Sequence, residues 1–166
     1  MPKAVSDSST LIHLAGIGHL NLLVEFYEKI LIPPAVWKEV VEEGQGRPGT
    51  REVEEGRRSR WIEVVKPSNK SVVRLLKLEL HDGEAEAIAL AIEQHPEIVF
   101  LDETEARRVA DAYGLHKTGL IGILLRAKLE GKVQSLRGEL DRLRQEAGFW
   151  IGDDVYRQAL RAVGEE

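Results

Sequence analysis

Short apolar runs recur along this chain, and segments with helical character separate them. Four of these runs have the length and composition of buried strands, and they lie at residues 3–7, 30–32, 61–65 and 98–101. Strands that are joined through helices favour a parallel sheet with right-handed crossovers. We therefore predict an α/β protein, a three-layer α/β/α sandwich around a central, mostly parallel sheet. Whether the strand at 61–65 joins this sheet is left open.

Helices are expected where polar residues and glycines bound periodic apolar stretches. Ser8, Ser9 and Thr10 offer side-chain oxygens to cap the first helix, and Asp153 or Asp154 offers one to cap the last. The predicted helices run through residues 11–15, 20–27, 35–43, 50–58, 72–80, 84–94, 103–113, 118–129, 135–147 and 153–162.

The composition narrows the class of protein. With 166 residues the chain is long enough to bury a core, and we expect residues 1–166 to form a single domain. It contains no cysteine, which excludes disulfides, thiolate zinc sites and cysteine nucleophiles. The formal net charge of −5 argues against nonspecific coating of nucleic acid but is compatible with a nuclease whose acidic pocket takes up metal. We expect no signal segment, no membrane association and a cytoplasmic location.

Four acidic residues stand at the edges of apolar segments: Asp7, Glu39, Glu84 and Asp102. Asp7 and Asp102 each end a predicted strand, and ligands of open α/β sheets bind at the carboxyl ends of the strands. Glu39 and Glu84 lie on predicted helices that could lean over the same edge. Carboxylates gathered in one place repel one another unless a cation lies between them, and hard oxygen ligands suit Mg²⁺ or Mn²⁺. The pattern therefore points to metal-assisted chemistry on a phosphate.

Each of these acids also has a purely structural interpretation. Asp7, Glu84 and Asp102 stand where a carboxylate caps a helix or interacts with its dipole, and Glu39 can be a solvated side chain. Glu103 follows Asp102 directly and is an alternative metal ligand. Three further glutamates compete with the helical pair for the same roles: Glu42, Glu43 and Glu86.

Several longer segments carry a family resemblance. They are Val5-Ser6-Asp7-Ser8-Ser9, Pro34–Val40, Gly83–Ala91, Phe100–Glu103 followed by Ala106–Ala110, Gly119–Lys128 and Phe149–Leu160. In this order and spacing the chain resembles the PIN domains, and within them an uncharacterised branch related to VapC-type toxins. The resemblance spans nearly the whole chain.

The resemblance implies a nuclease that holds one or two Mg²⁺ or Mn²⁺ ions and hydrolyses RNA phosphodiester bonds by water attack. The residues to which it assigns these roles are Asp7 as central ligand, then Glu39, Glu84 and Asp102, with Ser9 and Thr118 as supporting polar positions. It further implies a toxin paired with a small antitoxin protein, and a homodimer. Apolar Leu22, Leu23 and Phe26 are candidates for the dimer contact.

Two other functions fit parts of the sequence. A PIN-like module that binds RNA or protein without cutting would show the same pattern. A haloacid dehalogenase-type phosphatase would use Asp7 as nucleophile, Lys117 as its lysine and Asp153–Asp154 as a late metal pair. That enzyme needs a general acid two residues after the nucleophile, where this chain has Ser9. The phosphatase is therefore the weaker alternative.

The histidines and tryptophans give little direct signal for a site. The histidines show no metal-ligand spacing, and only His81, beside Asp82, lies near the predicted acids. Trp37, Trp61 and Trp150 lie in apolar contexts, so we expect them in the core or at an interface rather than as stacking platforms for bases.

Overall fold

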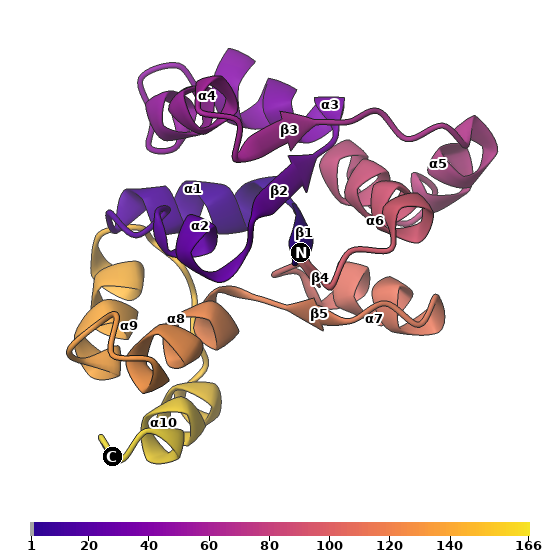
Figure 1. Cartoon of the computed structure of the whole chain (residues 1–166). Coiled ribbons are helices and arrows are strands. Elements are labelled where there is room, and N and C mark those ends of the chain that lie inside the picture. Colours follow the sequence, from indigo (N-terminus) through magenta and orange to yellow (C-terminus); the bar gives the residue numbers. More distant parts are fainter. Residues whose placement is uncertain (1) are drawn as a thin grey trace.

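A sheet of five parallel strands forms the centre of the computed structural model, which describes residues 2–166 (Figure 1). The strands are β1 (Lys3–Ser6), β2 (Lys29–Ile32), β3 (Ile62–Val64), β4 (Ile98–Phe100) and β5 (Lys117–Thr118). Their order across the sheet is β3-β2-β1-β4-β5. The predicted α/β/α sandwich is confirmed, and the strand at 61–65 joins the main sheet, because β3 pairs with β2.

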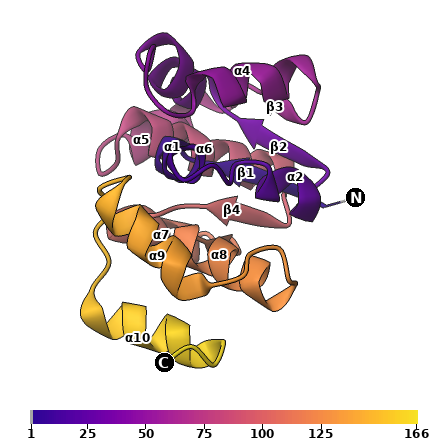
Figure 2. The same cartoon turned by 90° about the vertical axis from the view of Figure 1, so that its left-hand side faces the viewer.

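Helices cover both faces of this sheet (Figures 1 and 2). The core on one face is built by α1 (Ser8–Gly16), α2 (Leu22–Phe26), α3 (Pro34–Trp37), the π-helical turn η1 (Lys38–Glu42), α4 (Thr50–Arg58), α8 (Leu120–Leu129), α9 (Leu136–Gln145) and α10 (Asp153–Ala162). The core on the other face is built by α5 (Lys70–Leu76), α6 (Asp82–Gln94) and α7 (Thr104–Ala112). No helix within residues 2–166 is long and apolar enough to cross a membrane.

Neighbouring strand residues face opposite cores. Ala4 and Ile30 pack into the first core, whereas Val5 and Leu31 pack into the second. Side chains alternate in this way along any strand. Because helices cover both faces, both sets of positions are apolar, and the strands read as continuous hydrophobic runs in the sequence.

The strand order reverses between β1 and β4. The chain starts in the middle of the sheet with β1, adds β2 and β3 on one side, and then returns to add β4 and β5 on the other. The loops that leave β1 and β4 therefore diverge and open a crevice at the carboxyl edge of the sheet. Asp7 directly follows β1, and Asp102 lies just after the end of β4.

The helix predicted at residues 35–43 consists of two parts. It begins as α3 with Pro34 in the first turn, where proline's fixed φ and missing N–H are tolerated. It then widens into the π-helical turn η1, which contains Glu39. Such turns are rare and occur frequently at functional sites.

Three local predictions are wrong. Lys117–Thr118 form the edge strand β5, so α8 begins at Leu120 and not at Thr118. Of the capping residues considered for the first helix, Asp7 is confirmed, and the capping role predicted for residues 8–10 is wrong. Gly152 is the N-cap residue of α10, with no side-chain hydrogen bond, so neither Asp153 nor Asp154 has the predicted capping role.

Two predictions about apolar side chains also need correction. Leu22, Leu23 and Phe26 are at most 6% exposed and belong to the core, so they do not offer a dimer contact. Trp150 is 84% exposed, so of the two places predicted for it, the core and an interface, the core is excluded. The other two tryptophans are partly buried and pack against the first core, as predicted.

Candidate functional site

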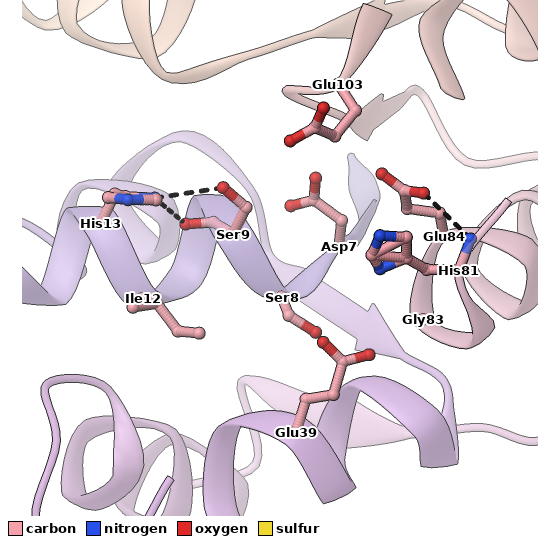
Figure 3. Close-up of a pocket in the computed structure, with 10 residues that line it drawn as sticks. All are labelled: Asp7, Ser8, Ser9, Ile12, His13, Glu39, His81, Gly83, Glu84 and Glu103. Atoms are coloured by element: carbon pink, nitrogen blue, oxygen red, sulfur yellow. Dashed lines mark hydrogen bonds between the residues drawn. The ribbon is translucent and has the colours of Figure 1, made fainter. Parts of the chain in front are cut away.

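A pocket of about 240 Å³ opens at the crevice between β1 and β4 (Figure 3). Its walls come from the start of α1, from η1, from the start of α6 and from the loop after β4. The residues that line it are Asp7, Ser8, Ser9, Ile12, His13, Glu39, His81, Gly83, Glu84 and Glu103. Four carboxylates from four separate segments therefore face one small volume.

Asp7 is fixed at the centre of this arrangement. Its side chain is buried, its Oδ1 accepts a hydrogen bond from the Thr10 N–H at 2.9 Å, and its Oδ2 accepts one from the Asp102 N–H at 3.2 Å. Burial, and then the neighbouring Asp102 carboxylate, raise the pKa of Asp7 to about 8. A carboxyl group in such surroundings gives up its proton readily only when a positive charge is near. The capping role and the place in the pocket thus belong to the same side chain.

The carboxylate of Glu39 lies against Gly83, a residue without a side chain, at the wall of the pocket. A Cβ atom at Gly83 would lie 2.5 Å from Oε1 of Glu39 and 3.4 Å from Oγ of Ser8. The missing side chain at Gly83 therefore leaves the space that the Glu39 carboxylate occupies. Figure 3 shows this carboxylate beside Ser8, at the side of the pocket opposite Glu103.

Ser8 contributes an unusual polar atom. Its Oγ is the only buried side-chain oxygen or nitrogen within residues 2–166 that has no hydrogen-bond partner. An unsatisfied buried polar group costs about 1–3 kcal/mol. The hydroxyl is therefore free to donate to, or accept from, a group that enters the pocket.

Glu84 and Glu103 complete the ring of carboxylates. Glu84 Oε1 accepts a hydrogen bond from the His81 N–H at 3.3 Å, which places Glu84 in a capping box at the start of α6. Burial is the main cause that raises the pKa of Glu84, and the charges of Glu103 and Glu39 raise it further. The negative charges of Glu103 and Glu39 therefore both act on Glu84. Figure 3 shows Glu84 and Glu103 on either side of the space next to Asp7.

Asp102 does not line this pocket. Its Oδ1 accepts a hydrogen bond from the Leu120 N–H at 3.0 Å, and its Oδ2 accepts one from Oγ1 of Thr10 at 3.0 Å. Asp102 thus ties the start of α8 to α1, and its carboxylate is near enough to that of Asp7 to raise the Asp7 pKa. Burial is the main cause that raises its pKa. Thr118 also lies outside the pocket, and both Asp102 and Thr118 line a neighbouring cavity.

The comparisons with known proteins agree with this geometry. A family model described as a PIN domain matches residues 3–165. The chain belongs to the PIN domain family. The fold is thus of a nuclease type, and the pocket lies at the carboxyl edge of its sheet. No curated protein matches the chain.

Sequence reasoning placed Asp7, Glu39, Glu84, Glu103 and Ser9 of this PIN domain near one another, and the structure brings all of them to the pocket. It missed Ser8, His13 and Gly83. His13 follows Ser9 by one helical turn, and its Nδ1 contacts the Ser9 carbonyl oxygen at 2.8 Å, so helical spacing could have revealed it. The role of Gly83 had no sequence signal, because it depends on a glutamate from a distant segment.

The donors in this PIN domain suit a hard cation. Besides the imidazoles of His13 and His81, the pocket offers four carboxylates and the hydroxyls of Ser8 and Ser9, and such oxygen ligands are the ones that Mg²⁺ and Mn²⁺ prefer. The unpartnered Ser8 hydroxyl and the room left at Gly83 for Glu39 also fit a site that accepts an additional group. Within residues 2–166 no three Asp, Glu or His side chains form a ready-made metal-binding cluster. Binding an ion would therefore require the glutamate side chains to rotate inward.

The residues that a phosphatase would need lie elsewhere. Lys117 pairs with Asp111 at 2.6 Å, at the start of β5 and away from the carboxyl edge. Asp153 and Asp154 are exposed at the start of α10 and do not line the carboxylate pocket. This placement gives the phosphatase alternative no support.

Proposed function

We propose that this PIN domain is an endoribonuclease that uses Mg²⁺ or Mn²⁺ to hydrolyse phosphodiester bonds in RNA. The observation that carries the proposal is the convergence of Asp7, Glu39, Glu84 and Glu103 on one pocket where the strand order reverses. Catalytic sites need groups held in place by rigid elements. Here the end of β1, the π-helical turn η1, the first turn of α6 and the N-cap position of α7 hold them.

The carboxylates have different roles in this proposal. Asp7 is the central metal ligand, because two backbone N–H groups fix its carboxylate. Glu39, Glu84 and Glu103 have longer side chains and supply the remaining oxygens. An ion held there would acidify a water molecule and offset negative charge on the phosphate as it reacts.

Asp102 is a positioning residue in this proposal. Its backbone N–H holds Asp7, and its carboxylate holds Thr10 and the start of α8. Ser9 stays a supporting position, since its Oγ contacts His13 Nδ1 at 3.1 Å at the pocket wall. Thr118 lines the neighbouring cavity and not the pocket, and we assign it no catalytic role.

The test is cleavage of a labelled RNA with Mn²⁺ or Mg²⁺ and with EDTA, by wild type, Asp7→Asn and Asp111→Asn. Asp111→Asn removes one negative charge, as Asp7→Asn does, but on the surface of α7, where Asp111 pairs with Lys117. It is therefore a matched control. We expect metal-dependent cutting by wild type and Asp111→Asn, and a loss of at least about a hundredfold in Asp7→Asn. Equal cutting by Asp7→Asn would exclude the proposal.

A metal-binding measurement distinguishes a pocket that binds metal without cutting RNA from a pocket that binds no metal. We expect Mn²⁺ to raise the unfolding temperature of wild type and Asp111→Asn but not of Asp7→Asn, because a ligand that binds only the folded state stabilises it. RNA binding without cutting and without a metal response would favour the alternative, a PIN-like module that binds RNA or protein.

The cellular role we propose is that of a toxin with a small antitoxin partner. Expression of the wild type should then arrest growth, and Asp7→Asn should relieve the arrest. We also propose a homodimer, which sedimentation at tens of micromolar tests directly. Its contact must lie outside the buried α2 residues considered above.

A further inference from the structure

A second cavity, of about 600 Å³, adjoins the carboxylate pocket. Glu103 lines both. A second link is aromatic, because His13 of the pocket meets Phe149 of the cavity edge to face, with ring centroids 4.9 Å apart. The cavity lies between the first turns of α7 and α8 and the segment at 149–152 that precedes α10. The two hollows are therefore neighbours on the surface.

Trp150 presents its ring to solvent at this cavity. The residue is 84% exposed, which leaves a large apolar π-surface uncovered. The ring lies close against the backbone of Gly152, where a Cβ would be 3.3 Å from Cη2 of the indole. The next residue, Ile151, is buried, and its carbonyl oxygen accepts a hydrogen bond from Arg144 Nη2 at 2.8 Å. An exposed aromatic ring is therefore carried by an anchored segment.

The same cavity contains an unpaired positive charge. Arg107 on α7 is exposed and lines the cavity, and it makes no salt bridge within residues 2–166. Proteins that bind single-stranded nucleic acid combine such cations, which track the phosphates, with aromatic rings on which bases stack. In a duplex the bases are already stacked on their neighbours, so a ring of this kind favours unpaired bases.

We propose that this cavity binds an unpaired base of the RNA strand whose phosphodiester lies in the carboxylate pocket. The base stacks on Trp150, and a neighbouring phosphate pairs with Arg107. This inference rests on the proposed function and adds to it a base-binding subsite beside the carboxylate pocket. Trp150 and Arg107 are positioning residues for that strand.

The experiment measures binding of a short fluorescein-labelled single-stranded RNA by anisotropy, in EDTA so that no cleavage takes place. The proteins are wild type, Trp150→Ala, Trp150→Phe and the control Leu78→Ala. Leu78 is also largely exposed, at 80%, but lies away from both cavities. We expect Trp150→Ala to weaken binding roughly 5- to 100-fold, as loss of one stacked base does. Trp150→Phe should retain most of the affinity, and Leu78→Ala should match wild type.

Two further arms address the charge and the strand. Arg107→Gln should weaken binding and reduce its salt dependence, because one phosphate contact is lost. A duplex of the same sequence should bind more weakly than the single strand and should not respond to Trp150→Ala.

The outcomes separate this inference from the proposed function. Wild-type affinity in Trp150→Ala, or no single-strand binding by wild type, overturns the inference even if RNA is cut. Binding that depends on Trp150, with no metal-dependent cutting in the preceding assay, supports the cavity and overturns the endoribonuclease.

Discussion

The backbone N–H of Asp102 donates a hydrogen bond of 3.2 Å to Oδ2 of Asp7, and this bond spans the point where the strand order reverses. The two residues are neighbours only because β1 and β4 pair in parallel. Asp7 cannot swing away without breaking this bond and its cap on α1. The carboxylate of Asp7 is therefore held in one position relative to the ends of β1 and β4.

In metal-free buffer we expect the Asp7 carboxyl to lower stability as the pH rises from about 4 to about 8. Its pKa is raised from 3.8 to about 8 in the folded protein. Between these values the folded state therefore keeps a proton that the unfolded chain has lost. The contribution to the slope is at most about 1.4 kcal/mol per pH unit, and it is negative.

Asp7→Asn does not titrate, so its urea midpoint in EDTA should vary less with pH over this range than that of wild type. Asp111→Asn should keep the wild-type slope. If wild type and Asp7→Asn lose stability in parallel, the buried Asp7 does not titrate as described.

Substitutions of Asp102 and of Glu103 should differ in their effect on the free energy of unfolding. Asp102→Ala leaves the Leu120 N–H and the Thr10 hydroxyl without their acceptor, so we expect a loss of about 1–3 kcal/mol in the free energy of unfolding. Glu103→Gln changes an exposed side chain and should stay within about 0.5 kcal/mol of wild type.

Metal dependence should reveal the role of Glu103. Glu103→Gln should weaken the rise of the unfolding temperature with Mn²⁺, whereas Glu97→Gln, an exposed change at the opposite end of β4, should not. An unaltered Mn²⁺ response in Glu103→Gln would remove Glu103 from the ligand set.

Gly83→Ala should separate function from stability. The new methyl group would displace the Glu39 carboxylate, which is the end of a flexible side chain and can move at little cost. Alanine also favours a helix over glycine by up to about 1 kcal/mol. We therefore expect unchanged or higher stability in EDTA, with cleavage reduced about tenfold or more.

The control for that variant is Gly138→Ala on α9, where the added Cβ would meet Ser135 only at an ordinary contact distance of 3.5 Å. It should leave cleavage unchanged. Full activity in Gly83→Ala would show that the position of Glu39 seen here is not the one used in catalysis.

Ser8→Ala tests the unpartnered hydroxyl. Removing a buried polar group that lacks a hydrogen bond should leave stability in EDTA unchanged or raise it by about 1 kcal/mol. The same variant should show a smaller stabilisation by Mn²⁺ if the hydroxyl contacts the bound ion or its water. A clear loss of stability in EDTA would mean that the hydroxyl already has a partner.

Much of the fold could be predicted because the strands are apolar on both faces. The runs around Val5, Ile30, Ile62 and Val99 stand out against charged helices, and each is a strand. The strand at Lys117–Thr118 could not be recognised, because two polar residues are too few to show the alternation of a strand. The apolar pattern of α8 also begins only two residues later, at Leu120, and masks the boundary.

The site was less predictable because side-chain partners come from distant segments. Asp102 was expected to line the pocket with Asp7; its carboxylate does lie near that of Asp7, but Thr10 and Leu120 hydrogen-bond it and it lines the adjoining cavity instead. The π-helical turn at Glu39 has no sequence signature that alternation or periodicity detects. The exposure of Trp150 could not be predicted either. Its sequence neighbours are apolar, but this does not tell which side chains of a loop face the core and which face solvent.

The contact between Gly83 and Glu39 has a consequence for how relatives of this chain vary. A relative with a larger residue at the position of Gly83 has no room for a glutamate carboxylate there. Such a relative should carry a shorter acid at the position of Glu39, or a different one nearby. The residues at these two positions, which lie far apart in sequence, would then vary together among relatives, and this covariation would indicate that they are in contact.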